Sequence, residues 1–128
     1  MSSVNEITGS IVGAAIRVHQ ALGPGLLESA YEACLMYELG ELGLSVKNQL
    51  VLPVRYKGIE IDAGYRIDLL VEEQVIVELK SVERILPVHK AQLLSYLRLA
   101  NKVTGLLINF NERFLKDGVK RVMNGYIQ

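Results

Sequence analysis

The stretch Val75-Ile-Val-Glu-Leu-Lys80 gives the clearest indication of the fold of this 128-residue chain. It is apolar on both faces, which is typical of a central strand that other elements cover on both sides. Successive side chains of a strand point to opposite faces, so Glu78 and Lys80 are expected on the same face as Ile76. Two charged side chains at the end of a buried strand are costly unless they are paired or used.

A second run, Arg66–Val71, precedes this strand, and the short loop Glu72-Glu73-Gln74 between them predicts a β-hairpin. With Glu73 at the centre of the loop, Asp68 lies directly opposite Glu78. Opposed residues share a face, with their Cβ atoms about 4.5–5.5 Å apart. Carboxylates at that distance repel each other, and a hard divalent cation such as Mg²⁺ would relieve the repulsion.

The same register places Arg66 opposite Lys80. The four charged side chains of the hairpin could therefore form a salt-bridge patch at the margin of a sheet. The spacing Asp-x9-Glu-x-Lys is short and consists of common residue types, so the hairpin alone leaves both interpretations open.

The rest of the chain predicts helices on either side of the hairpin. Apolar residues recur at helical spacing, and Ser3 with Glu6 fits a capping box. Helices are predicted over residues 4–21, 26–39 and 88–101. Further strands are predicted over residues 50–54, 59–61 and 103–110, while the tail 111–128 stays open between a strand and a helix. The strands before the third helix are expected to form a meander of three or four. The order α-α-β-β-β-α-β predicts one α/β domain over residues 1–128, with a mixed central β-sheet flanked by helices.

Cysteine content and the N-terminus bear on location. Cys34 is the only cysteine, which excludes an intrachain disulfide or a cysteine-based zinc cluster and suits a reducing compartment. The N-terminal residues lack a basic leader, and the apolar stretch Ile7–Ile16 is too short to span a bilayer. We therefore expect a soluble cytoplasmic protein with no membrane partner.

Charge is balanced in total but unevenly distributed. Residues 1–79 contain 5 Lys/Arg and 11 Asp/Glu, a net charge of −6, whereas residues 80–128 contain 9 Lys/Arg and 3 Asp/Glu, a net charge of +6. The split indicates either a charged partner for one part or attraction between the two halves. The basic residues around the motif strand could face a phosphate backbone, but aromatic residues do not interleave with them as base stacking would require. These basic residues are Lys80, Arg84, Lys90, Arg98 and Lys102.

Three motifs together resemble a known group of proteins. Asp68 with Glu78-Leu79-Lys80 on a hairpin between helices resembles the signature of the PD-(D/E)xK nuclease superfamily, although Ile67 replaces its leading proline. In the following helix, Gln92 and Tyr96 are similar to the Q-x3-Y of the RecB-like branch. Upstream, Gly25-Leu-Leu-Glu-Ser-Ala-Tyr31 resembles the G-x-x-E-x-x-Y signature of the GxxExxY protein family within that superfamily.

The resemblance implies a restriction-endonuclease-like core and hydrolysis of nucleic-acid phosphodiester bonds with Mg²⁺ or Mn²⁺. Asp68, Glu78 and the backbone carbonyl of Leu79 would bind the metal. Glu28 would be a further acidic ligand or would hold a metal-bound water. Lys80 would orient the attacking water and stabilise charge on the phosphoryl oxygens. DNA is favoured over RNA as the partner, and a homodimer or larger complex is compatible with the small size.

Other residues would contact the substrate, according to the same resemblance. Gln92 would position the lysine or the substrate, and Tyr31, Tyr96 and Arg84 would bind the substrate. Two alternatives stay open. The chain could be a non-catalytic nucleic-acid- or protein-binding module on the same fold, or a small subunit whose acidic half docks on a larger protein.

Overall fold

A computed structural model describes residues 3–125 of the chain. The α-helices are α1 (Val4–Leu22), α2 (Glu28–Glu41) and α3 (Pro87–Ala100). The main sheet has five strands in the order β1-β4-β5-β6-β7, with the bounds Val46–Val51, Arg66–Val71, Val75–Lys80, Thr104–Asn109 and Val119–Met123. A short 3-10 helix, η1 (Leu115–Gly118), precedes β7, and a separate two-stranded sheet consists of β2 (Val54–Tyr56) and β3 (Ile59–Ile61).

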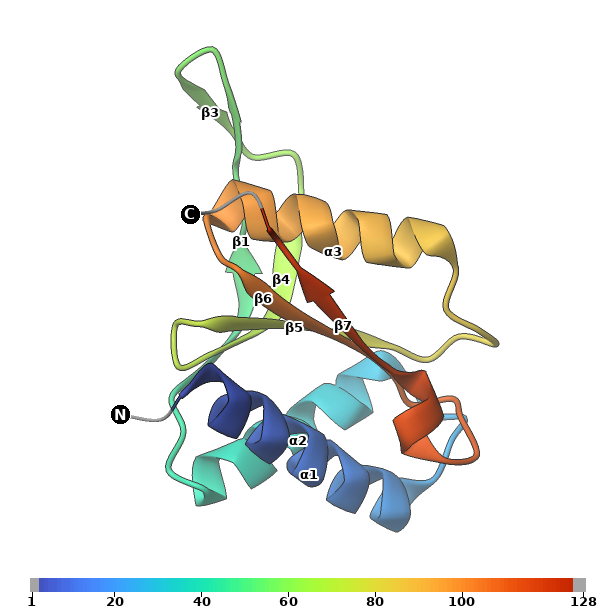
Figure 1. Cartoon of the computed structure of the whole chain (residues 1–128). Coiled ribbons are helices and arrows are strands. Elements are labelled where there is room, and N and C mark those ends of the chain that lie inside the picture. Colours follow the sequence, from blue (N-terminus) through green and yellow to red (C-terminus); the bar gives the residue numbers. More distant parts are fainter. Residues whose placement is uncertain (1–2, 126–128) are drawn as a thin grey trace.

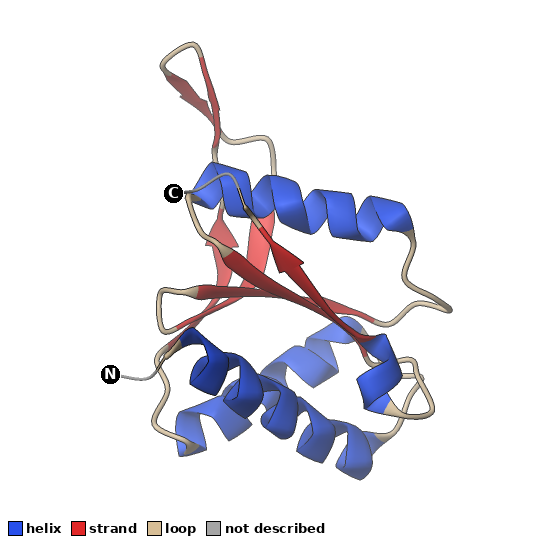
Figure 2. Ribbon diagram, viewed as in Figure 1, coloured by secondary structure: helices blue, strands red, loops and turns tan. Residues whose placement is uncertain are grey.

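The main sheet lies between two helical layers (Figures 1 and 2). Helices α1 and α2 cover one face, where they bury Val77 and Leu79 of β5. Helix α3 covers the other face, where Leu93 belongs to the same core cluster as Ile76. The predicted alternation along β5 is confirmed, and it assigns Glu78 to the α3 side of the sheet.

Local sequence signals fix the ends of α1. The Glu6 N–H donates to Ser3 Oγ over 3.2 Å, and the Ser3 N–H donates to Glu6 Oε1 over 3.3 Å, so the predicted capping box is present. The helix ends at Gly23, whose φ of 70° is a conformation that glycine adopts without strain. Pro24 follows and cannot continue a helix. The chain therefore turns back into α2 along the same face of the sheet.

The connection through α3 determines where β5 ends. Strands β5 and β6 are parallel, whereas the other neighbouring strands of the main sheet are antiparallel. A parallel pair needs a crossover, and α3 supplies it. A Cβ added to Gly105 of β6 would lie 3.1 Å from the side chain of Leu93, so the helix sits close to the strand. The predicted mixed α/β fold, a sheet flanked by helices, is confirmed.

The segment between α2 and β4 differs from the prediction. The sequence predicted one strand over residues 50–54 and another over residues 59–61. The structure instead has β1, which begins at Val46, followed by the separate hairpin of β2 and β3. Pro53 cannot donate a ladder hydrogen bond and separates β1 from β2. The hairpin then projects past the end of the main sheet (Figure 1), and its apolar residues are exposed instead of joining the core, with Ile59 62% exposed.

The sequence left the tail open between a strand and a helix, and the structure has one of each. Helix η1 and strand β7 occupy Leu115–Met123, and the predicted tail residues 126–128 lie outside the described residues. Within residues 3–125, no helix combines the length and the apolar character that crossing a membrane would require.

Gly118 provides a test of how η1 packs against the end of β6. A Cβ at this position would overlap the carbonyl oxygen of Asn109 and lie 2.8 Å from Cγ of Glu112. We expect Gly118→Ala to lower the free energy of unfolding by about 2–3 kcal/mol, because the backbone of β6 must shift. Gly9→Ala is the control, since open space surrounds Gly9 in α1 and alanine favours a helix. Urea denaturation measures both, and equal midpoints for the two variants would contradict this packing.

Candidate functional site

Strands β4 and β5 separate at the two carboxylates that the sequence placed opposite each other. The ladder runs as predicted through Leu70 opposite Ile76 and ends at the pair Leu69–Val77. Beyond this pair, the backbone N–H groups of Asp68 and Leu79 donate to carboxylate side chains of the opposite strand instead of to its backbone. The Asp68 N–H donates to Glu78 Oε2 over 2.9 Å. The structure therefore brings Asp68 and Glu78 together.

A second hydrogen bond makes this arrangement reciprocal. The Leu79 N–H donates to Asp68 Oδ2 over 2.8 Å. Each carboxylate thus uses one oxygen to satisfy the backbone of the opposite strand and keeps a second oxygen. The predicted pairing of Arg66 with Lys80 is wrong, because the strands have diverged by that point. Arg66 lies opposite Val51 of β1 instead.

Burial raises the pKa of both carboxyl groups, and nearby negative charge adds to the effect at each. Glu78 is 5% exposed, and burial together with the charge of Asp68 raises its pKa to about 8. Burial also raises the pKa of Asp68, and the charge of Glu32 adds to this effect. The hydrogen bond from the Leu79 N–H acts in the opposite direction. The protein therefore holds two adjacent carboxyl groups that lack enough positive charge around them.

Lys80 stands at the end of β5, half-buried, next to this pair. Its positive charge lowers the pKa of both Asp68 and Glu78. Among residues 3–125, however, no ion pair joins Lys80 to either carboxylate. The ammonium group acts on the pair from a distance and stays available to a ligand.

A residue that sequence reasoning missed holds the chain after Lys80. Asn109 of β6 lies opposite Lys80 and is fully buried. Its Oδ1 accepts from the N–H of Val82 over 3.0 Å, and its Nδ2 donates to the carbonyl of Val82 over 2.9 Å. A buried asparagine at the end of an apolar strand was the signal that could have found it.

Gln49 and Glu32 were also missed, and they approach Asp68 from the other side. Gln49 of β1 has a φ of 50°, which is uncommon for a residue other than glycine. Its Nε2 donates to Glu32 Oε1 over 2.6 Å and to Asp68 Oδ1 over 3.4 Å. Backbone strain of this kind clusters at functional sites. Residue type alone gives no sign of it.

Glu28 lies near the pair but apart from it. It is exposed at the first position of α2, and its charge contributes to the raised pKa of Glu78. Ser81, just after β5, donates from Oγ to the carbonyl of Leu26 over 2.7 Å and ties the loop before α2 to the site. A polar hollow beside Lys80 is lined by residues 25–29 together with Ser81 and Asn111.

The structure does not support direct contact between Tyr31 and a substrate. Tyr31 is fully buried, and its ring stacks on Phe110 with centroids 4.3 Å apart. Its hydroxyl donates to the carbonyl of Gly23 over 2.6 Å and accepts from the N–H of Leu26 over 3.1 Å. The prediction of substrate binding is corrected: Tyr31 fixes the loop that leads into Glu28.

Helix α3 and the loop before it carry the remaining predicted residues. Gln92 and Tyr96 line a cavity on the α3 side of the sheet. Tyr96 is close enough to the carboxylates that their charges help burial to raise its pKa. Arg84 is exposed in the loop between β5 and α3. Of these three side chains, Tyr96 is the one on which the charges of Asp68 and Glu78 act.

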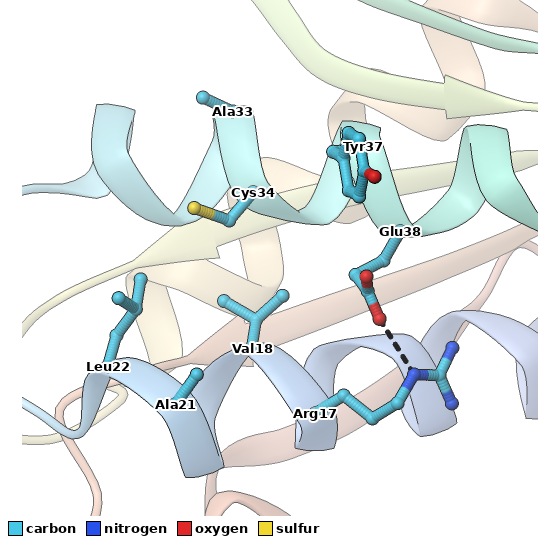
Figure 3. Close-up of a pocket in the computed structure, with 8 residues that line it drawn as sticks. All are labelled: Arg17, Val18, Ala21, Leu22, Ala33, Cys34, Tyr37 and Glu38. Carbon is cyan, nitrogen blue, oxygen red and sulfur yellow. Dashed lines mark hydrogen bonds and ion pairs between the residues drawn. The ribbon is translucent and has the colours of Figure 1, made fainter.

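A different groove lies between α1 and α2 (Figure 3). Its lining is mostly apolar and includes the half-buried Cys34, and an Arg17–Glu38 ion pair of 2.8 Å bridges the two helices. None of the predicted site residues lines this groove. The groove between α1 and α2 is therefore separate from the predicted site.

The donor set fits a hard divalent cation only in part. Within residues 3–125, no three or more Asp, Glu, His or Cys side chains gather closely enough to hold a metal ion. The predicted third carboxylate, Glu28, is therefore not assembled with the pair. Two carboxylates and a carbonyl such as that of Leu79 are nevertheless the hard oxygen ligands that Mg²⁺ uses with water. A cation beside the pair would favour the charged form of Glu78, whose pKa burial and the charge of Asp68 raise.

Comparison with known families gives the site its context. The model of the PD-(D/E)XK nuclease superfamily matches residues 5–122. The chain belongs to the PD-(D/E)XK nuclease superfamily. Neither a curated protein nor a solved structure matches the chain. PD-(D/E)XK nucleases generally use divalent metal ions.

The pH dependence of stability tests the electrostatics of the pair. The pKa of Glu78 is about 8 in the folded protein against an ordinary value of 4.5. A raised carboxyl pKa favours folding only while the group stays protonated, so stability without metal falls as pH rises from about 4.5 to 8. We expect Glu78→Gln to be more stable than the wild type at pH 8.5 by on the order of 4 kcal/mol.

Thermal melting in EDTA at pH 5 and pH 8.5 measures this difference. Glu41→Gln, an exposed carboxylate at the end of α2, is the control and should follow the wild type. Mg²⁺ at pH 8.5 should stabilise the wild type and leave Glu78→Gln unchanged. If Glu78→Gln and the wild type lost stability in parallel as the pH rose, the raised pKa would be refuted.

Proposed function

We propose that this chain is a metal-dependent nuclease whose centre is the Asp68–Glu78 pair at the divergence of β4 and β5. The observation that carries the proposal is the reciprocal bonding of two buried carboxylates beside Lys80. Membership in the PD-(D/E)XK nuclease superfamily supports hydrolysis of phosphodiester bonds. We expect the metal ligands, Lys80 and the residues around the pair to supply what that reaction requires.

Asp68, Glu78 and the carbonyl of Leu79 would hold Mg²⁺ or Mn²⁺. A divalent ion supplies charge neutralisation at the phosphate and lowers the pKa of bound water. The bonds to the backbone N–H groups of Asp68 and Leu79 fix both carboxylates before any ion arrives. This preorganisation reduces the entropy that metal binding would otherwise cost.

Lys80 would orient the attacking water and stabilise negative charge on the phosphoryl oxygens. A lysine ammonium is a compact point charge on a flexible stem, which suits this electrostatic role. Asn109 is a positioning residue in this proposal, because its bonds to Val82 fix the chain just after Lys80. The lysine is thus held at the end of a rigid strand.

The surrounding residues would serve the substrate and the outer metal environment. Glu28 would bind a metal-bound water or approach the ion once substrate closes the polar hollow. Gln92 and Tyr96 would line the cleft, as the Q-x3-Y of the RecB-like branch suggests, and Arg84 would contact a phosphate. The G-x-x-E-x-x-Y motif supports assignment to the GxxExxY family.

We propose DNA as the first substrate to test and RNA as its comparison. Residues 1–128 would form one domain with one site, so the cleavage of both strands of a duplex would require a homodimer or a larger complex. The single cysteine fits a cytoplasmic setting. A module that only binds nucleic acid or protein is the alternative outcome of the experiment below.

Cleavage of labelled oligonucleotides tests the proposal. Single- and double-stranded DNA and RNA are incubated with Mn²⁺ and the wild type, Glu78→Gln or Lys80→Ala. We expect both variants to lose at least about 100-fold in rate, because each removes charge that the transition state requires. Melting curves of the same preparations show that the variants are folded.

Lys120→Ala is the matched control, since Lys120 is an exposed lysine on the edge strand β7. It should cleave like the wild type. Equal cleavage by Glu78→Gln and the wild type would show that the activity belongs to a contaminant or to another site. Binding without cleavage under all metal conditions would favour the non-catalytic module.

A further inference from the structure

A cavity adjoins the carboxylate pair on the α3 side of the sheet. One wall is α3, and the other is the base of the β2–β3 hairpin. Its lining combines two aromatic rings, two aliphatic side chains, an amide and a hydroxyl: Val54, Tyr65, Gln92, Ser95, Tyr96 and Leu99. Flat apolar walls with hydrogen-bonding groups at the rim suit a planar heterocycle with polar edges.

Two tyrosines give the cavity its shape. The rings of Tyr65 and Tyr96 meet edge to face, with centroids 5.8 Å apart and an angle of 64°. Tyr96 is 6% exposed and forms the fixed floor, whereas Tyr65 is 41% exposed. Because Tyr65 is only partly covered and Tyr96 meets it edge to face, Tyr65 offers an aromatic surface on which another ring could stack.

The backbone of Tyr65 is held in place. The Leu52 N–H donates to the carbonyl of Tyr65 over 3.0 Å and closes the base of the hairpin. The guanidinium of Arg66 donates to the same carbonyl over 2.9 Å and to Asp62 Oδ1 over 3.3 Å. A ring anchored in this way needs little reorganisation to receive a ligand.

The cavity lies close to the proposed centre. Tyr65 precedes β4 directly, and Asp68 follows three residues later, about 10 Å along an extended strand. The charges of Glu78 and Asp68 also reach Tyr96, since they help to raise its pKa. One ligand strand could therefore place a phosphate at the carboxylate pair and a neighbouring group in the cavity.

We propose that this cavity binds one unpaired nucleobase of the substrate strand, stacked on Tyr65 with its polar edge toward Gln92 and Ser95. The amide and hydroxyl groups can both donate and accept hydrogen bonds, which suits any base edge. A base inside a duplex is stacked and paired, so it cannot enter. The protein therefore selects single-stranded or locally unpaired nucleic acid. The inference rests on the proposed function for the identity of its ligand.

Fluorescence of 2-aminopurine tests the inference without cleavage. A single-stranded DNA oligonucleotide that carries the fluorescent base is titrated with the wild-type protein in EDTA. We expect quenching as the base stacks, and we expect the same sequence in a duplex to bind at least tenfold more weakly. Tyr65→Ala should weaken single-strand binding about tenfold, whereas Tyr65→Phe should retain it, because stacking needs the ring and not the hydroxyl.

Two further variants keep the test decisive. Ser95→Leu fills the cavity from an exposed position on α3 with a side chain that cannot stack on a base. It should also remove the quenching, and it covers the case in which Tyr65→Ala does not fold. Tyr37→Ala, on α2, removes an exposed tyrosine that does not line the cavity and should bind like the wild type.

Three results would overturn the inference: equal affinity for single strand and duplex, wild-type quenching with Tyr65→Ala or Ser95→Leu, or no quenching of any oligonucleotide. Since binding is measured in EDTA, its failure is distinguishable from a failure of metal-dependent cleavage. Cleavage with no quenching would refute only the base site, and quenching with no cleavage would refute only the nuclease.

Discussion

The site depends on one constraint, the exchange of a backbone ladder for two carboxylate–backbone hydrogen bonds at the end of β4 and β5. Asp68 accepts from the N–H of Leu79, and Glu78 accepts from the N–H of Asp68. These bonds let the strands separate without leaving backbone donors unsatisfied in a buried place. They also force two acidic groups together, and burial then makes their charge costly. The same two hydrogen bonds therefore shape the ends of the strands and bring together the carboxyl groups whose pKa values are raised.

The rest of the fold supports this point from three directions. Helix α3 carries the chain across to the parallel strand β6, whose Asn109 holds the segment after Lys80. Tyr31 stacks on Phe110 and fixes the loop that leads to Glu28. From β1, Gln49 reaches Asp68 out of a strained backbone conformation. Each of these elements positions a group near the Asp68–Glu78 pair, whereas the two carboxylates themselves come from β4 and β5.

Local geometry explains what the sequence could predict. A hairpin loop centred on Glu73 sets the register of the two strands, and the alternation along β5 then decides which side chains share a face. Asp68 and Glu78 could therefore be placed together from the sequence alone. The β2–β3 hairpin shows where this reasoning stops. Its apolar alternation predicted a strand in the sheet, but Pro53 breaks the ladder and the hairpin projects free of the core.

Residues from distant segments could not be found in the same way. Asn109 and Gln49 reach the site through pairing of the sheet, and no local pattern predicts that pairing. Tyr65 and Tyr96 meet only because the hairpin base folds against α3. The opposite error concerns Tyr31, which a motif placed in contact with the substrate and which the structure buries. Glu28 of the same motif is exposed at the start of α2 and, within residues 3–125, does not form a group of three acidic side chains with the pair.

Calorimetric titration with Mn²⁺ measures whether the reciprocal carboxylate pair binds a cation. We expect the wild type and the Glu41→Gln control to bind the ion, and we expect Asp68→Asn and Glu78→Gln each to lose binding while remaining folded. If both of these variants bound Mn²⁺ with the affinity of the wild type, the carboxylate pair would not be the metal site.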